Sequence, residues 1–160
     1  MLRAFFSPVL WLVSLVSLAA LTGCGSVGKL GGVTISVVAL RSPESGGSAN
    51  AQVVMNLRFT NENVVPVGIS RARHKLFLNG TLAGEVMNEA PLGLPPLTSL
   101  SQDVTLPLSA ATSATLRELA QRPQTSYRIE SILYIDAGEE KMDIKTQNQG
   151  SVDLTGLRLN

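Results

Sequence analysis

The sequence predicts a mainly β protein, an antiparallel β-sandwich with one short helix, placed after an apolar leader. Short runs of β-branched and aromatic residues recur along the chain after the leader, and turn-forming residues separate them at intervals of about 8 to 12 residues. Only one segment has helical spacing, and no repeat of fixed period is present. The predicted strands span residues 33–40, 51–60, 67–78, 81–87, 101–108, 125–137, 141–146 and 151–159.

Alternation and turns define the first strands. Residues 33–40 are rich in β-branched side chains and end before a Ser-Pro-Glu-Ser-Gly-Gly loop. In residues 51–60 apolar and polar side chains alternate, which is typical of a strand with one buried face. Its predicted inward side chains are Val53, Met55, Leu57 and Phe59.

A tight hairpin is predicted after residues 67–78. Leu76 and Leu78 share one face of that strand. Asn79-Gly80 follows, and both residues accept the positive φ that a two-residue hairpin turn requires. Residues 81–87 form the returning strand, and residues 91–97, with two adjacent prolines, form an irregular crossing segment.

The second half of the chain predicts another alternating strand, the helix and the late strands. Val104, Leu106 and Leu108 point inward from residues 101–108. Residues 109–122 have helical composition and spacing, with Ser113 as a predicted cap of the final turns and a proline directly after the segment. The long strand 125–137 places on one face Tyr127, Ile129, Ser131, Leu133 and Ile135.

The leader has the order of a secretory signal: the basic residue Arg3, an apolar stretch from Phe5 to Leu21, then small residues. Leu21, Thr22, Gly23 and Cys24 resemble the lipobox of bacterial lipoproteins at every position. The resemblance implies signal-peptidase recognition of the first three residues and cleavage before Cys24. It also implies a diacylglycerol on the Cys24 sulfur and acylation of the new amino group.

The predicted organisation is a lipoprotein signal peptide over residues 1–23, a lipidated glycine-rich tether over 24–32 and a sandwich domain over 33–160. Several acyl chains anchor a protein stably, whereas one chain binds only marginally. Gly25 follows the cysteine where an inner-membrane retention signal would have Asp. This resembles lipoproteins passed to the outer membrane, so in a Gram-negative host we expect the periplasmic face of that membrane.

Two alternatives remain open for the same residues. The stretch from Phe5 to Leu21 is about 17 residues, at the short limit for a transmembrane helix, and Pro8 interrupts its start. Cys24 could instead be a free thiol behind a plain signal. It is the only cysteine of the chain, so it has no disulfide partner within it.

The charge balance excludes several classes of function. Arg3 is the only charge of the leader, so 12 of the 13 basic side chains remain against 12 acidic ones. A neutral domain argues against nucleic-acid binding and against electrostatic docking on anionic lipid. With no further cysteine, disulfide frameworks and cysteine-based metal sites are excluded too.

Residues for catalysis or metal binding are sparse, and we predict neither an enzyme nor a cofactor or metal site. His74, the only histidine, lies in the basic run from Arg71 to Lys75, which we expect to be a solvated strand face with an exposed histidine. Glu139-Glu140 lacks the pattern of a calcium loop. No serine lies in a Gly-x-Ser-x-Gly motif.

A family resemblance adds to this prediction. A strand ending in Asn61 and Asn63 precedes Pro-Val-Gly-Ile; then follow Leu-Phe-Leu-Asn-Gly, a Leu-Pro-Pro connector, a short helix and Tyr-Arg-Ile. This order resembles the type-2 late embryogenesis abundant proteins, whose module is the water-stress and hypersensitive-response (WHy) domain. Glu62 replaces a proline usual in the family, and Glu130 replaces a glycine.

The resemblance implies an immunoglobulin-like or fibronectin-III-like sandwich and a link to desiccation tolerance, with no catalytic residues. Asn61 and Asn63 are then expected to be structural, holding the backbone of a tight crossing between strands.

Our leading hypothesis is therefore a lipid-anchored, non-enzymatic envelope protein that protects or scaffolds the envelope under desiccation or osmotic stress. The alternative is an accessory lipoprotein that binds one protein or lipid partner in envelope assembly or transport, where an exposed strand edge could pair with the partner. A hydrolase is the third hypothesis, and it would need an activated nucleophile that the motifs do not supply.

Overall fold

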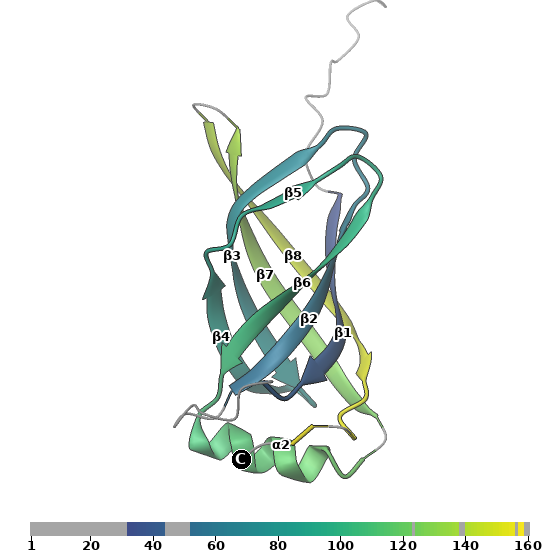
Figure 1. Ribbon diagram of the computed structural model, residues 1–160, viewed down its shortest axis with the longest axis vertical. Helices are drawn as coiled ribbons and strands as arrows, with labels where there is room; N and C mark the ends of the chain where they lie inside the picture. Colours follow the sequence, from purple (N-terminus) through teal and green to yellow (C-terminus); the bar gives the residue numbers. More distant parts are fainter. Residues whose placement is uncertain (1–31, 44–51, 123, 138–139, 156, 159–160) are drawn as a thin grey trace, which may run out of the picture.

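The computed structural model describes residues 32–43, 52–122, 124–137, 140–155 and 157–158. The predicted signal peptide and nearly all of the predicted tether lie outside these ranges. The described chain forms two antiparallel sheets packed face to face, with one helix across the lower end (Figure 1). The predicted fold class is confirmed.

The smaller sheet has the strand order β1-β2-β6. These strands are β1 (Val33–Arg41), β2 (Gln52–Asn61) and β6 (Ser99–Pro107). The larger sheet has the order β4-β3-β7-β8, and β5 adds to the edge of β3. Its strands are β3 (Val67–Leu78), β4 (Thr81–Asn88), β5 (Leu92–Leu94), β7 (Thr125–Ala137) and β8 (Glu140–Val152), and the helix α2 is Ala110–Leu119.

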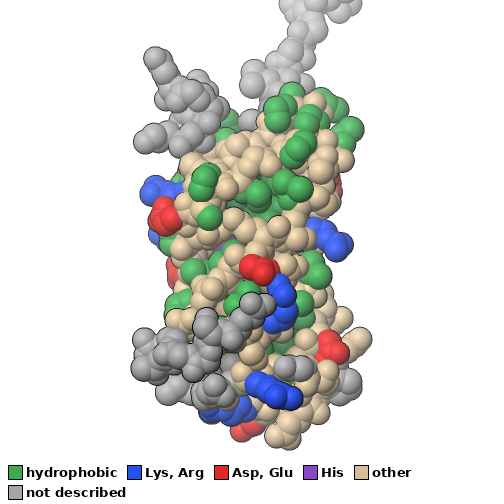
Figure 2. All heavy atoms as spheres, viewed as in Figure 1, with side chains coloured by type: hydrophobic (Ala, Val, Ile, Leu, Met, Phe, Trp, Pro, Cys, Tyr) green, Lys and Arg blue, Asp and Glu red, His purple; other side chains and the backbone are tan. Residues whose placement is uncertain are grey.

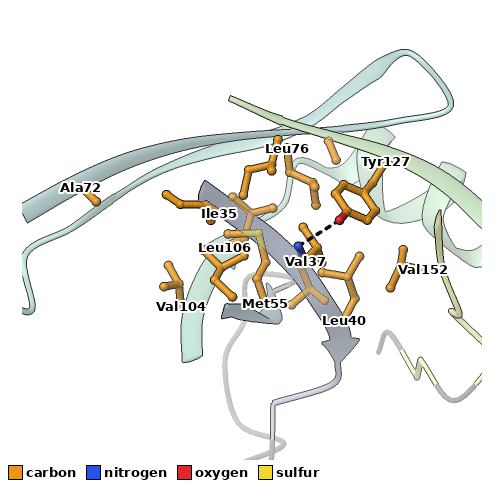
Figure 3. Close-up of a cluster of buried hydrophobic side chains, with 14 of the residues drawn as sticks. Ile35, Val37, Leu40, Met55, Ala72, Leu76, Val104, Leu106, Tyr127 and Val152 are labelled. Atoms are coloured by element: carbon orange, nitrogen blue, oxygen red, sulfur yellow. Dashed lines mark hydrogen bonds between the residues drawn. The ribbon is translucent and has the colours of Figure 1, made fainter. Parts of the chain in front are cut away.

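The core lies between the sheets and includes the side chains that alternation predicted to point inward. The four predicted apolar positions of β2 are all fully buried. Leu76 of β3 in the facing sheet and Leu106 of β6 in the same sheet are fully buried as well, and Figure 3 shows both beside Met55 of β2. The Asn79-Gly80 turn has φ values of 48° and 83°, the left-handed backbone that its residues predict.

A tyrosine joins the two sheets through the core. Tyr127 reaches from β7, and its hydroxyl accepts a hydrogen bond of 3.2 Å from the backbone N–H of Val37 in β1 (Figure 3). The register of β1 against β2 shifts between Val37 and Ala39, so this N–H lies where the ladder is irregular. The buried phenol thereby satisfies a donor that would be costly to leave unpaired.

Three sequence predictions about the elements were wrong in detail. Residues 141–146 and 151–159 do not form two strands, because β8 runs without a break and pairs with β7 from Glu140 to Val152. Inside β8, Gly150 lies close to Tyr127 of β7, since a Cβ there would be 2.9 Å from the Tyr127 ring. The crossing segment 91–97 contains the short strand β5.

The third error concerns the cap of α2. Ser113 does not cap the final turns, where the C-cap is Ala120; the N-cap is Ser109, whose hydroxyl accepts a hydrogen bond from the Thr112 N–H. Ser113 is buried one turn later and donates to the Ser109 carbonyl oxygen.

Candidate functional site

Asn61, the last residue of β2, organises one end of the sandwich. Its side chain is 1% exposed, and its amide nitrogen donates to the carbonyl oxygens of Val65 at 2.9 Å, Leu94 at 3.2 Å and Pro95 at 3.0 Å. Its amide oxygen accepts from both the backbone N–H and the side-chain nitrogen of Asn63, at 3.0 and 2.9 Å. The buried amide of Asn61 thus connects, through hydrogen bonds, two loops that are distant in sequence.

Backbone hydrogen bonds close the same end. The Asn61 N–H donates to the Thr98 carbonyl at 2.9 Å, and the Leu97 N–H donates to the Asn63 carbonyl at 3.1 Å. The Glu62 N–H donates to the carbonyl of Gly32, the residue before β1, at 2.7 Å. The loops 62–66 and 95–98 and the start of the described chain therefore form one hydrogen-bonded unit.

This unit presents an apolar surface to solvent. Val64 is 79% exposed and Leu97 is 70% exposed. We call the exposed apolar residues of the two loops the apolar tip, which consists of Val64, Val65, Pro66, Pro95, Pro96 and Leu97. Figure 2 shows hydrophobic side chains gathered at this upper end of the molecule. Glu62 is the only charged residue of the two loops.

Leu97 also has an unusual backbone, with φ of 51°. The left-handed region is unfavourable for a leucine by roughly 1–2 kcal/mol, because Cβ approaches the following carbonyl oxygen. The hydrogen bond from the Leu97 N–H to Asn63 helps hold this conformation. Its side chain contributes little to the core, so the strain serves no packing purpose within the described chain.

The prediction of an exposed His74 was wrong, because its side chain is 0% exposed and points between the sheets. Its Nδ1 lies 2.8 Å from the Ser131 hydroxyl of β7, and its ring packs edge-on against Phe59 of β2. No partner for Nε2 exists in the described part of the chain. Desolvation by burial lowers the pKa of His74 to about 4, so the imidazole is neutral at pH 7.

The alternation of β3 contained the signal for this burial. His74 precedes Leu76 by two residues, and Leu76 and Leu78 were predicted to share a face, so His74 lies on that face as well. The Ser131–His74 pair is enclosed in the core, with Ser131 only 3% exposed. A substrate cannot reach that hydroxyl in this conformation, so the pair serves structure rather than nucleophilic catalysis.

The basic run of β3 divides between the two faces of the sheet. Ala72 and His74 point inward, while Arg71, Arg73 and Lys75 lie on the outer face. Glu85 of β4 lies 3.7 Å from Arg73 Nε and 3.4 Å from Lys75 Nζ. These two ion pairs are exposed, so they contribute little to stability, and the face is solvated as expected.

A shallow hollow of about 350 Å³ lies on the same outer face, next to Arg73, Lys75 and Lys145. Glu130 also lines the hollow, and Glu85 pairs with two of these cations. Because two of the three cations are paired and two carboxylates lie beside them, this hollow is not a concentrated anion site.

The described residues include neither Glu139 nor the predicted lipobox, which is Leu21, Thr22, Gly23 and Cys24. Within the described ranges, no group of three metal-ligating side chains is close enough to hold an ion. No helix in those ranges combines the length and the apolar character needed to cross a bilayer.

Comparisons with known proteins support the fold. No protein-family model and no curated protein sequence matches the chain. The solution structure of the Arabidopsis thaliana protein AT1g01470 matches with a TM-score of 0.55 at 14% identity, covering 79% of this chain and 83% of that one. This likeness shows a shared fold.

Two further solved structures match less well. A crystal structure of an Archaeoglobus fulgidus protein has a TM-score of 0.43 at 16% identity, covering 72% of this chain and 95% of that one. The solution structure of a candidate late embryogenesis abundant protein has a TM-score of 0.42 at 14% identity, covering 89% of this chain and 83% of that one.

Proposed function

We propose that this protein is a lipid-anchored, non-enzymatic component of a bacterial cell envelope that protects or scaffolds the envelope under desiccation or osmotic stress. The observation that carries the proposal is the place of the family landmarks in the fold. Asn61 and Asn63 close a strand crossing, and Asn79-Gly80 forms a hairpin. The landmarks that resemble type-2 late embryogenesis abundant proteins thus coincide with the turns of the sandwich.

A structural role, and not a catalytic one, fits the polar side chains of the described domain. Ser131 and His74 form a hydrogen-bonded pair within the core, and Arg73 and Lys75 beside the hollow pair with Glu85. A domain of this kind acts through its surface and its location.

The lipobox-like residues 21–24 would determine where the domain is located. Acylation of Cys24 would hold the domain at a membrane by more than one chain, which makes attachment stable. Eight residue steps separate Cys24 from Gly32. Even fully extended they span only about 28 Å, so the domain would remain near the lipid surface.

The test is a deletion strain complemented with the wild-type chain or with Cys24→Ser, dried and then rehydrated. We expect deletion to lower survival, wild type to restore it, and Cys24→Ser to accumulate as uncleaved precursor without restoring it. Crosslinking and purification of the lipoprotein run in parallel. Undiminished survival of the deletion strain, together with stoichiometric recovery of one partner, would replace the protective role with the accessory role.

A further inference from the structure

We propose that the apolar tip inserts into the surface of the membrane that holds the Cys24 acyl chains. The two-loop end of the sandwich would then face the bilayer, with α2 directed away from it. This proposal rests on the lipid anchoring proposed above, and it adds an orientation and a second, non-covalent membrane contact.

The first argument is where the chain reaches the domain. The Gly32 carbonyl accepts from Glu62 inside the hydrogen-bonded unit, and Val33 pairs with Asn61. A tether of at most about 28 Å therefore starts at the apolar tip and at no other part of the surface. Any anchor at Cys24 brings this end of the domain toward the lipid first.

The second argument is chemical. Large apolar side chains that stand exposed together are typical of interaction sites, whereas scattered ones are ordinary. The apolar tip joins three aliphatic side chains with three prolines, and Glu62 is the only charged residue in the two loops that carry it. Without basic residues the tip cannot attract anionic headgroups, so its contact with lipid must come from burial of apolar surface.

The third argument is preorganisation. Asn61 fixes both loops through bonds to Val65, Leu94 and Pro95, so the tip does not have to order itself on contact. Leu97 is held at a φ of 51° with its side chain outward. Such strain concentrates at functional positions, and here it keeps a leucine exposed to solvent.

The opposite end offers a matched control. Leu82 of β4 is 47% exposed and borders an apolar hollow of about 220 Å³ against α2. The 12 residues of β3 separate the two ends by about 36 Å, because a strand rises about 3.3 Å per residue. A tether of about 28 Å cannot place the Leu82 end on the membrane with the tip pointing away.

The experiment uses the full chain, expressed in its host and reconstituted into vesicles of phosphatidylethanolamine and phosphatidylglycerol with or without brominated acyl chains. Trp11 is the only tryptophan of the sequence and lies in the predicted signal peptide. Cleavage therefore leaves Val64→Trp, Leu97→Trp or Leu82→Trp as the sole emitter in each variant. The wild-type chain is the blank, and all three substitutions are at exposed sites.

We expect tryptophan at 64 or 97 to lose at least about half of its emission in brominated vesicles, since interfacial burial of about 5–10 Å brings it near the acyl chains. Tryptophan at 82 should be unaffected. Protein that floats with the vesicles but shows no quenching at 64 and 97 overturns the tip proposal and leaves the anchor intact. Protein that does not float, or wild-type protein that retains Trp11 emission, overturns the cleaved lipid anchor and the tip proposal with it.

Discussion

The opening between the two sheets is closed in different ways at the two ends of the sandwich. At one end, α2 lies across the opening between the sheets, and Leu116 and Leu119 extend the core into the helix. At the other end, no helix of the described chain covers the opening, and Asn61 closes it with hydrogen bonds to two loops. One end is closed by apolar burial and the other by a polar network.

This difference decides which side chains are free to meet a partner. The helix buries its two leucines in the core, and the large side chains on its exposed face are those of Arg117 and Glu118. The polar network at the other end leaves its apolar residues outside, on Val64, Val65 and Leu97. An end held by hydrogen bonds can therefore be stable and still expose apolar surface.

The largest expected effect is at the polar end, from Asn61→Asp. A carboxylate has no N–H for the carbonyls of Val65, Leu94 and Pro95, and it places a charge where the side chain is 1% exposed. We expect a loss of about 4 kcal/mol in the free energy of unfolding, measured by urea denaturation at pH 7. Asn63→Ala, which removes one amide from the edge of the network, should lose about 1 kcal/mol. Equal losses in the two variants would mean that Asn61 is not the centre of the network.

The helix-covered end should respond to volume instead of hydrogen bonds. Leu116 is fully buried, so Leu116→Ala should lower the free energy of unfolding by about 3 kcal/mol through lost burial and a residual cavity. Thr115→Ala on the exposed face of α2 is the control, with an expected change within about 0.5 kcal/mol. If Leu116→Ala had as little effect as the control, α2 would not be part of the core.

His74 lies between the ends and sharpens the contrast with Asn61, because only one of its ring nitrogens has a partner among the described residues. Burial lowers its pKa from 6.5 to about 4, so the unfolded chain binds a proton between these values and the folded chain does not. Stability should be constant above pH 6.5 and should fall by about 2–3 kcal/mol as the pH drops to 4.

Urea midpoints measured from pH 7.5 to pH 4 test this expectation. His74→Gln should flatten the slope in that range, whatever its effect at pH 7. An unchanged slope in the variant would assign the titration to another group.

The smallest expected effect is at the apolar tip. Leu97→Asn should raise the free energy of unfolding by about 0.5–1 kcal/mol, because asparagine tolerates the left-handed backbone and no core packing is lost. Val64→Asn, at a neighbouring exposed site without positive φ, should change stability by less than about 0.5 kcal/mol. A destabilised Leu97→Asn would show that the leucine side chain packs in solution. Thermal unfolding of the two variants side by side measures the difference.

The sequence predicted most of the strands because inward and outward side chains differ in polarity with a period of two. The burial of four side chains in β2 could be predicted without knowing which strands lie beside it; they are Val53, Met55, Leu57 and Phe59. The prediction that His74 is exposed was wrong because residue type was given more weight than the position of His74 in the alternation. Its burial depends on Phe59 and Ser131, which the fold brings from other strands.

Gly150 and the apolar tip show the second limit of the sequence. A glycine among polar residues resembles a turn, and only the Tyr127 ring above it explains a glycine inside β8. Val64, Val65 and Pro66 form an ordinary loop in the sequence. Their exposure together with Leu97 follows from the Asn61 bonds, which connect residues more than 30 positions apart.

Intact mass spectrometry of protein extracted from the native host tests the account most directly, because the orientation of the two ends depends on the anchor. The account predicts a chain that begins at Cys24 and carries the mass of a thioether-linked diacylglycerol plus an amide-linked acyl group. A free Cys24 thiol, or a chain that still contains residues 1–23, would contradict it.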